Sequence, residues 1–449
     1  MTSIAHTKRL VVLPVERTAE SMASVERHKS LVLRAWIFAG LFFMALPGTV
    51  LGFSNLLAIS TNHGLGNLPA AWIQGHGHAQ VFGWIGSFVL GIGFYSQPAR
   101  SRSVLWVPLT SFALWTSGVA MRWTADIYGW HWRMLFAVSS TFELIALVLF
   151  LKASSHHKMP EQIGDSRTKA RMELWMVSVL VSTAGLAALV IFNFVVCMRL
   201  ALGGTSRAFP HALDQIFLLL LAWGFLVPVV WGFSARWFPT FLAIAKPNAK
   251  VFGASLALDI TGVICGIAGW TQTATILLLL SALSMGWALH LTQKPHGPAK
   301  TQGIHRSFPV FARLSYVWLV IAGCLGVWAA FADVHGGIWG ASRHALTVGF
   351  AATMVFTIGP RILPHFSGIY NLFSKRLMLL SLLLLQIGCT LRVLSEPLAY
   401  EGIQAFAWKT LPISGVLELS GVVVFAINMA LTLITGRAFW QHNVQAHAA

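Results

Sequence analysis

A succession of long apolar segments constrains the fold of this chain more than any other feature of its sequence. A transmembrane α-helix needs about 20 mostly apolar residues to cross the hydrocarbon core of a bilayer. The chain is 56% hydrophobic and only 10% charged, whereas a soluble domain carries about 25% charged residues. The sequence therefore predicts an all-α integral membrane protein with twelve transmembrane helices. The expected spans are roughly 31–58, 71–96, 103–122, 133–152, 173–197, 211–236, 251–270, 273–292, 314–333, 339–363, 377–394 and 411–436.

The charged residues predict how these spans are threaded. The chain has 31 Lys and Arg against 14 Asp and Glu, a formal net charge of +17, which in a soluble protein would suggest a nucleic-acid partner. Membrane proteins instead collect Lys and Arg in their cytoplasmic loops. With the N-terminus in the cytoplasm and twelve spans, the basic residues left on the outer side are Arg122, Arg133, Arg199, Arg207, Arg343, Arg392 and Lys409. The excess charge therefore indicates topology rather than nucleic-acid binding, with both termini cytoplasmic and a bacterial inner membrane as the expected location.

A histidine–alanine pair recurs at equal intervals. The repeated histidines are His78, His211 and His344, and each is 133 residues from the next. Each lies near the start of the second span of a four-span group. Internal repeats of this kind indicate repeated structural units. We expect three pseudo-symmetric four-helix units, over about 31–152, 173–292 and 314–436. Together they form one membrane domain, 31–437, between cytoplasmic tails 1–30 and 438–449.

The recurring histidines are the candidate ligands of a metal or cofactor. Ionisable residues are costly within membrane spans and usually face the interior of the bundle, and neutral imidazole is a good ligand for iron and copper. His76 adds a fourth member to the set His78, His211 and His344. Residues two apart on a helix point about 200° apart, so His76 and His78 would serve two different sites. The alternative is that these are interfacial histidines bonded to lipid or loop carbonyls.

A few acidic and basic residues accompany the histidines. Asp214 lies three residues after His211, on the same helix face, where it could accept the ring N–H of that histidine or belong to a proton path. Glu143 and Asp259 lie within spans and would be costly without partners, which makes them candidates for a proton path. Arg343 directly precedes His344 and is a candidate partner for the propionates of a haem.

The arrangement of spans and histidines resembles the catalytic subunit of the haem–copper oxidases. Locally the sequence is more similar to the NnrS family, membrane proteins linked to nitric oxide metabolism and stress that contain haem and copper. The matching stretches are GHGHAQVFG at 75–83 and HALTVG at 344–349. The resemblance implies one or two b-type haems held between facing histidines, with copper as an alternative at the second site.

The resemblance also implies which histidines face each other. His344 would pair with His76 or His78, and the other member of that pair would meet His211. An oxidase needs further histidines on span seven and a tyrosine on span six, and neither 251–270 nor 211–236 contains them. Oxidase-type reduction of dioxygen is therefore not expected.

Three functions remain open at the level of sequence. The first is a membrane haem protein in nitric oxide metabolism or respiratory electron transfer, with an enzymatic, nitric oxide-related oxidoreductase activity left open. Its electron donor would be another protein or a quinol. The second is a secondary transporter of twelve spans without haem, although transporters usually show twofold repeats. The third is a non-catalytic haem-bearing subunit or sensor.

Overall fold

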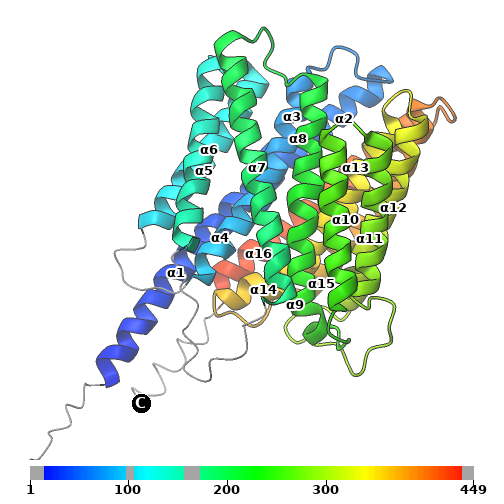
Figure 1. Ribbon diagram of the computed structural model, residues 1–449. Coiled ribbons are helices and arrows are strands. Elements are labelled where there is room, and N and C mark those ends of the chain that lie inside the picture. Colours follow the sequence, from blue (N-terminus) through cyan, green and yellow to red (C-terminus); the bar gives the residue numbers. More distant parts are fainter. Residues whose placement is uncertain (1–14, 98–105, 156–171, 437–449) are drawn as a thin grey trace, which may run out of the picture.

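The protein is an all-helical bundle whose long helices run side by side (Figure 1). The computed structural model describes residues 15–97, 106–155 and 172–436, with side chains from Glu26 onward. Within these residues there is no β-strand, and eleven helices are long and apolar enough to cross a membrane. Residues 1–14 and 437–449 of the predicted tails lie outside the described part, whereas 15–30 belong to the first helix. The protein is therefore an integral membrane protein.

Four of the long helices are interrupted by a π-helical segment, in which the hydrogen bonds run from i to i+5. These are α1 (Val15–Phe43), η1 (Met44–Val50) and α2 (Leu51–Asn62); α3 (Ala70–His78), η2 (Ala79–Gly86) and α4 (Ser87–Ser96); α8 (His211–Leu219), η4 (Leu220–Leu226) and α9 (Val227–Phe241); and α13 (Gly337–His344), η5 (Ala345–Ala352) and α14 (Thr353–Phe366). The others are α5 (Trp106–Tyr128), α6 (Trp132–Ser155), α7 (Leu174–Gly203), α10 (Ala249–Ile267), α11 (Thr271–Ala288), α12 (Phe308–Ala332), α15 (Lys375–Tyr400) and α16 (Ala407–Thr435).

One predicted span differs from the rest. The segment predicted at 103–122 falls on α5, a 23-residue helix that packs along α6. This helix is absent from the eleven that are apolar enough to span a membrane. It carries the buried side chains of Arg122 and Asp126, and their polarity lowers its hydropathy. These two side chains are paired with each other inside the bundle.

The second long helix of each predicted four-helix unit contains one of the π-helices η2, η4 and η5. Beyond these π-helices, α4, α9 and α14 surround a central cavity of about 100 Å³. Its wall is almost wholly apolar and includes Phe88, Val229 and Met354, one from each helix. The three second helices therefore meet at this cavity. Their first parts, α3, α8 and α13, lie on the other side of the π-helices from it.

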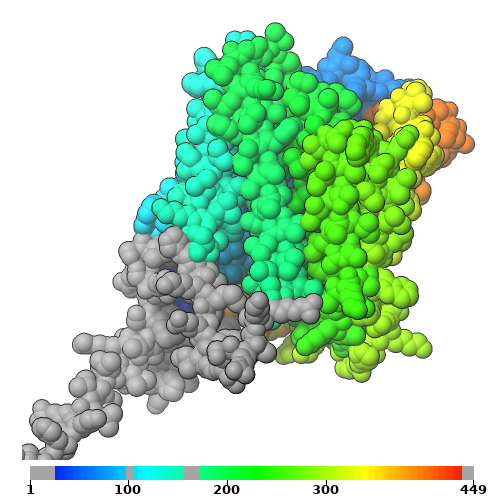
Figure 2. All heavy atoms as spheres, in the orientation of Figure 1, coloured from blue at the N-terminus to red at the C-terminus, as the bar shows by residue number. Residues whose placement is uncertain are grey.

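The outward surface of the bundle is also apolar. Figure 2 shows one such face, in which the green helices α7, α10 and α11 lie next to one another. Large apolar side chains are exposed on these helices, among them Leu180, Ile191, Ile264 and Leu283. Exposed apolar surface of this extent on a soluble monomer would mark an interaction site. On a helix bundle of this length it is the surface that contacts lipid.

Close packing of α7 against η4 yields a first prediction. A Cβ atom added at Gly185 would collide with the main-chain carbonyl group of Gly224, which cannot move aside as a side chain would. We expect Gly185→Ala to lower the free energy of unfolding by about 1–3 kcal/mol, the usual cost of overpacking. At Gly286 on α11 an added Cβ would meet no atom within 4 Å, so Gly286→Ala should be neutral or stabilising. Thermal unfolding in detergent measures both variants, and equal melting temperatures would contradict the prediction.

Candidate functional site

A cavity of about 170 Å³ lies among the helices that contain η1, η2, η4 and η5, together with α15 and α16. Most of its wall is apolar, with Trp84, Leu221 and Val422 as examples. The polar side chains in the wall are His76, Gln80, Thr49, His344, Thr347, Arg392 and Glu418. The cavity therefore brings together His76 from the first predicted unit and His344 from the third. The sequence alone leaves open whether His76 or His78 faces His344.

His76 enters the cavity from α3 with one ring nitrogen already engaged. Its Nδ1 lies 2.9 Å from the carbonyl oxygen of Gly48 in the π-helix η1. A carbonyl oxygen can only accept a hydrogen bond, so Nδ1 carries the proton and Nε2 keeps its lone pair. The ring packs against Gly52, where a Cβ atom would approach the His76 Cε1 to 2.5 Å. Gly48 and Gly52 thus place the ring and fix its tautomer.

His344 is held in the same way on the facing wall. It is the last residue of α13, and its Nδ1 lies 3.1 Å from the carbonyl oxygen of Gly340 and 3.4 Å from Oε2 of Glu396. Both partners are acceptors, so again Nε2 is the nitrogen that is left with a lone pair. An imidazole with Nδ1–H bonded to a carbonyl or carboxylate and Nε2 free has the arrangement that metal-ligating histidines show.

The carboxylate beside His344 is itself held by an arginine. Arg392 Nε lies 3.2 Å from Glu396 Oε2, and Arg392 Nη2 donates to Glu396 Oε1 at 3.3 Å. Both side chains are buried on α15, and Nη1 of Arg392 has no hydrogen-bond partner among the described residues. Neither residue of this pair was among the predicted site residues. The available signal was an arginine and a glutamate four residues apart, a helical ion-pair spacing, within an apolar span.

The groups in the cavity wall can be compared with those that bind a haem in other proteins. Two imidazoles with free Nε2 atoms line it, and Arg392 offers an unpartnered donor to an anionic group such as a propionate. Gly77 also lies in the wall, and a Cβ atom there would meet nothing within 4 Å. No three His, Cys, Asp or Glu side chains of the described part come close enough to form a metal-ion site of their own. Two imidazole Nε2 atoms and an arginine donor are the groups that a haem held by two histidines would need.

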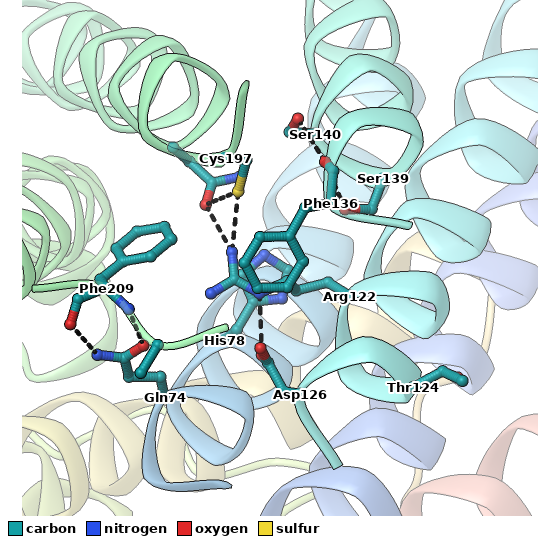
Figure 3. A network of polar contacts seen from close by, with 12 residues as sticks. Gln74, His78, Arg122, Thr124, Asp126, Phe136, Ser139, Ser140, Cys197 and Phe209 are labelled. Carbon is teal, nitrogen blue, oxygen red and sulfur yellow. Dashed lines mark hydrogen bonds and ion pairs between the residues drawn. The ribbon is translucent and has the colours of Figure 1, made fainter. Parts of the chain in front are cut away.

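His78 lies on the other side of α3, in a fully buried polar cluster (Figure 3). Its Nε2 lies 3.2 Å from Oε1 of Glu143 on α6. The other oxygen of Glu143 accepts a hydrogen bond of 2.9 Å from Asn193 on α7. The structure therefore directs His78 away from the cavity that His76 lines, and Glu143 is a partner of this histidine.

Arg122 joins the rest of the buried cluster. Its Nε lies 2.9 Å from Asp126 Oδ2, and its Nη1 contacts Asn193 and Cys197. The guanidinium also lies 4.2 Å from the ring centre of Phe136. One arginine thus connects α5 to α7 and faces the two carboxylates of the cluster from one side.

His211 occupies a different position from the other two repeated histidines. His78 and His344 each directly precede a π-helix, whereas the whole nine-residue helix α8 separates His211 from η4. His211 is eight residues further from its π-helix than the other two histidines are from theirs, which corresponds to about 12 Å along the helix axis. Its side chain is exposed, and no contact with His78 is found in the described part of the chain. The equal spacing in sequence therefore does not place His211 at an equivalent level.

The remaining candidates are distributed over separate places. Asp214 is partly buried, and no hydrogen bond or ion pair joins its side chain to His211 in the part of the chain that is described. Arg343 donates to Oε1 of Gln215 on α8, which ties α13 to that helix. Asp259 is buried on α10 away from the cavity wall, and its Oδ1 lacks a partner among the described residues.

Fold and site together define an all-helical integral membrane protein with paired histidines in an internal cavity. Residues 242–434 match the family described as a domain of unknown function (DUF8744). The match covers less than half of the chain and includes His344, Arg392 and Glu396 but not His76. No curated protein matches the chain.

Proposed function

We propose that the protein is a membrane haem protein that holds b-type haem between His76 and His344. The observation that carries the proposal is that both histidines line one cavity and each has Nδ1 engaged by a main-chain carbonyl. Their Nε2 atoms therefore remain available as ligands. A haem held by these two histidines would supply reversible one-electron transfer.

The role of the chain's own residues follows from their positions. Gly48 and Gly340 fix the tautomers, Glu396 orients His344, and Arg392 holds Glu396 and neutralises negative charge at the cavity. We assign the protein to respiratory electron transfer or nitric oxide metabolism in a bacterial inner membrane, with a quinol or another protein as electron donor. We propose haem, and no copper, at the cavity lined by His76 and His344.

The proposal includes the finer architecture predicted from sequence. We propose that α5 is the twelfth span and that three four-helix units surround the central apolar cavity, with both termini cytoplasmic. The π-helix in the second long helix of each unit supports the repeat. The pairing of Arg122 with Asp126 supports a membrane position for α5, because it compensates the two charges that reduce its hydropathy.

Optical spectroscopy of the purified protein tests the haem. We expect dithionite reduction to produce the Soret and α bands of a six-coordinate b-type haem, and the double variant His76→Ala/His344→Ala to lack them. His131→Asn is the matched control, because His131 is exposed in a turn with φ of 42°, a conformation that asparagine tolerates. A folded wild-type protein without haem would overturn the proposal and favour the secondary transporter.

A further inference from the structure

The two histidines of the cavity differ in what their Nδ1 atoms touch. We infer that His344 is the permanent ligand and His76 the exchangeable one, so that a small uncharged ligand such as carbon monoxide or nitric oxide binds on the His76 side. This inference rests on the proposed function, since it concerns the same haem. It adds which side of the site is open to chemistry and the class of molecule that enters.

Besides the Gly340 carbonyl that its Nδ1 contacts at 3.1 Å, His344 has an anion beside it. Glu396 Oε2 lies 3.4 Å from His344 Nδ1, and the carboxylate is kept in place by two contacts from Arg392. Glu396 is 5% exposed, so little water competes for it. A carboxylate on the far nitrogen of an imidazole raises the basicity of the ligating nitrogen. His344 is therefore the stronger electron donor of the pair.

Close packing adds to the fixed position of His344. A Cβ atom at Gly340 would collide with the carboxylate of Glu396, so α13 and α15 approach each other with no spare volume at this point. His344 also directly precedes η5, and its main-chain carbonyl accepts a contact from the thiol of Cys389 on α15. Movement of His344 away from the cavity would disturb all of these contacts.

The partner of His76 is neutral, and open space adjoins this histidine at Gly77, although its ring packs against Gly52. Its Nδ1 meets only the carbonyl of Gly48, which raises ligand basicity less than a carboxylate does. A Cβ atom at the next residue, Gly77, would meet nothing within 4 Å. Gln80 lies one helical turn further along the same face, and its Oε1 has no hydrogen-bond partner among the residues described. The side with the weaker donor thus also has the room for ring displacement and for an incoming ligand.

Carbon monoxide binding to the reduced protein tests whether His76 is the exchangeable ligand and His344 the permanent one. In wild-type protein we expect a rate that saturates with carbon monoxide concentration, because dissociation of His76 limits it. In His76→Ala we expect the haem to be retained and the rate to rise linearly with concentration. Retention of haem by His344→Ala together with its loss from His76→Ala would overturn the inference. A wild-type protein without haem would instead overturn the proposed function.

The role of Glu396 has its own readout. The iron–histidine stretching frequency of reduced His76→Ala, measured by resonance Raman, reports the donor strength of His344. We expect Glu396→Gln in that background to lower this frequency. Glu401→Gln is the matched control, because Glu401 makes a similar contact with His335 at 3.2 Å, away from the cavity. An unchanged frequency in the Glu396→Gln variant would show that the carboxylate does not act on His344; if that variant does not fold, the carbon monoxide kinetics above still decide.

Discussion

Replacing His344 with alanine is expected to leave the purified protein without the bands of b-type haem. In the proposed site His344 is the ligand that has the buried carboxylate of Glu396 3.4 Å from its Nδ1. Loss of such a partner alone typically costs about 10- to 100-fold in affinity, so loss of the ligand itself should reduce haem content by more than about 10-fold. The measurement is the pyridine haemochrome spectrum, normalised to protein concentration.

Two further arms make this result specific. Exogenous imidazole should partly restore the bands in His344→Ala, because it can occupy the space of the lost ring. His211→Ala should retain them, because that residue is exposed and separated from its π-helix by all of α8. Loss of haem from His211→Ala with retention in His344→Ala would contradict the cavity site and return the second predicted histidine pair to consideration.

Replacing Arg122 with methionine is expected to destabilise the protein strongly. The guanidinium pairs with Asp126 at 2.9 Å, and Glu143 lies in the same buried cluster. Removing the cation leaves two carboxylates without it inside the bundle, and breaking a buried pair in this way costs about 3–5 kcal/mol. Lysine should not rescue the variant, because it cannot reproduce the several directed contacts of the guanidinium.

Thermal unfolding in detergent measures this effect. Arg133→Met is the matched control, since Arg133 is exposed, donates to the carbonyl of Gly204 at 2.7 Å and lies over the ring of Trp132. Surface substitutions of this kind usually change stability by less than about 0.5 kcal/mol. Equal unfolding temperatures for the two variants would mean that the buried cluster does not stabilise the fold.

The sequence predicts the all-helical membrane bundle well because length and hydropathy alone decide it. It is less informative about α5, where Arg122 and Asp126 are compatible with the bundle only through contacts to each other and to α7. Such long-range pairing is invisible to a window of hydropathy. The crossing of α5 through the membrane therefore stays a prediction.

The separation of His76 from His78 was predictable from the sequence, whereas the position of His211 and the role of Glu396 were not. Helical periodicity places His76 and His78 on different faces of α3, and the structure gives them separate partners, Gly48 and Glu143. The position of His211 was not predictable, because equal sequence spacing does not reveal where a π-helix begins. The partnership of Glu396 with His344 depends on two spans meeting in space, and no local pattern encodes it.

The π-helices η2 and η5 have one more consequence. Each lies between a histidine and the apolar residues that line the central cavity. An α-helix advances about 100° per residue, so the wider turn of a π-helix offsets the two halves of the span in angle. The half that carries the histidine, α3 or α13, can therefore face different neighbours from the half that lines the central cavity, α4 or α14, although the two halves form one continuous helix.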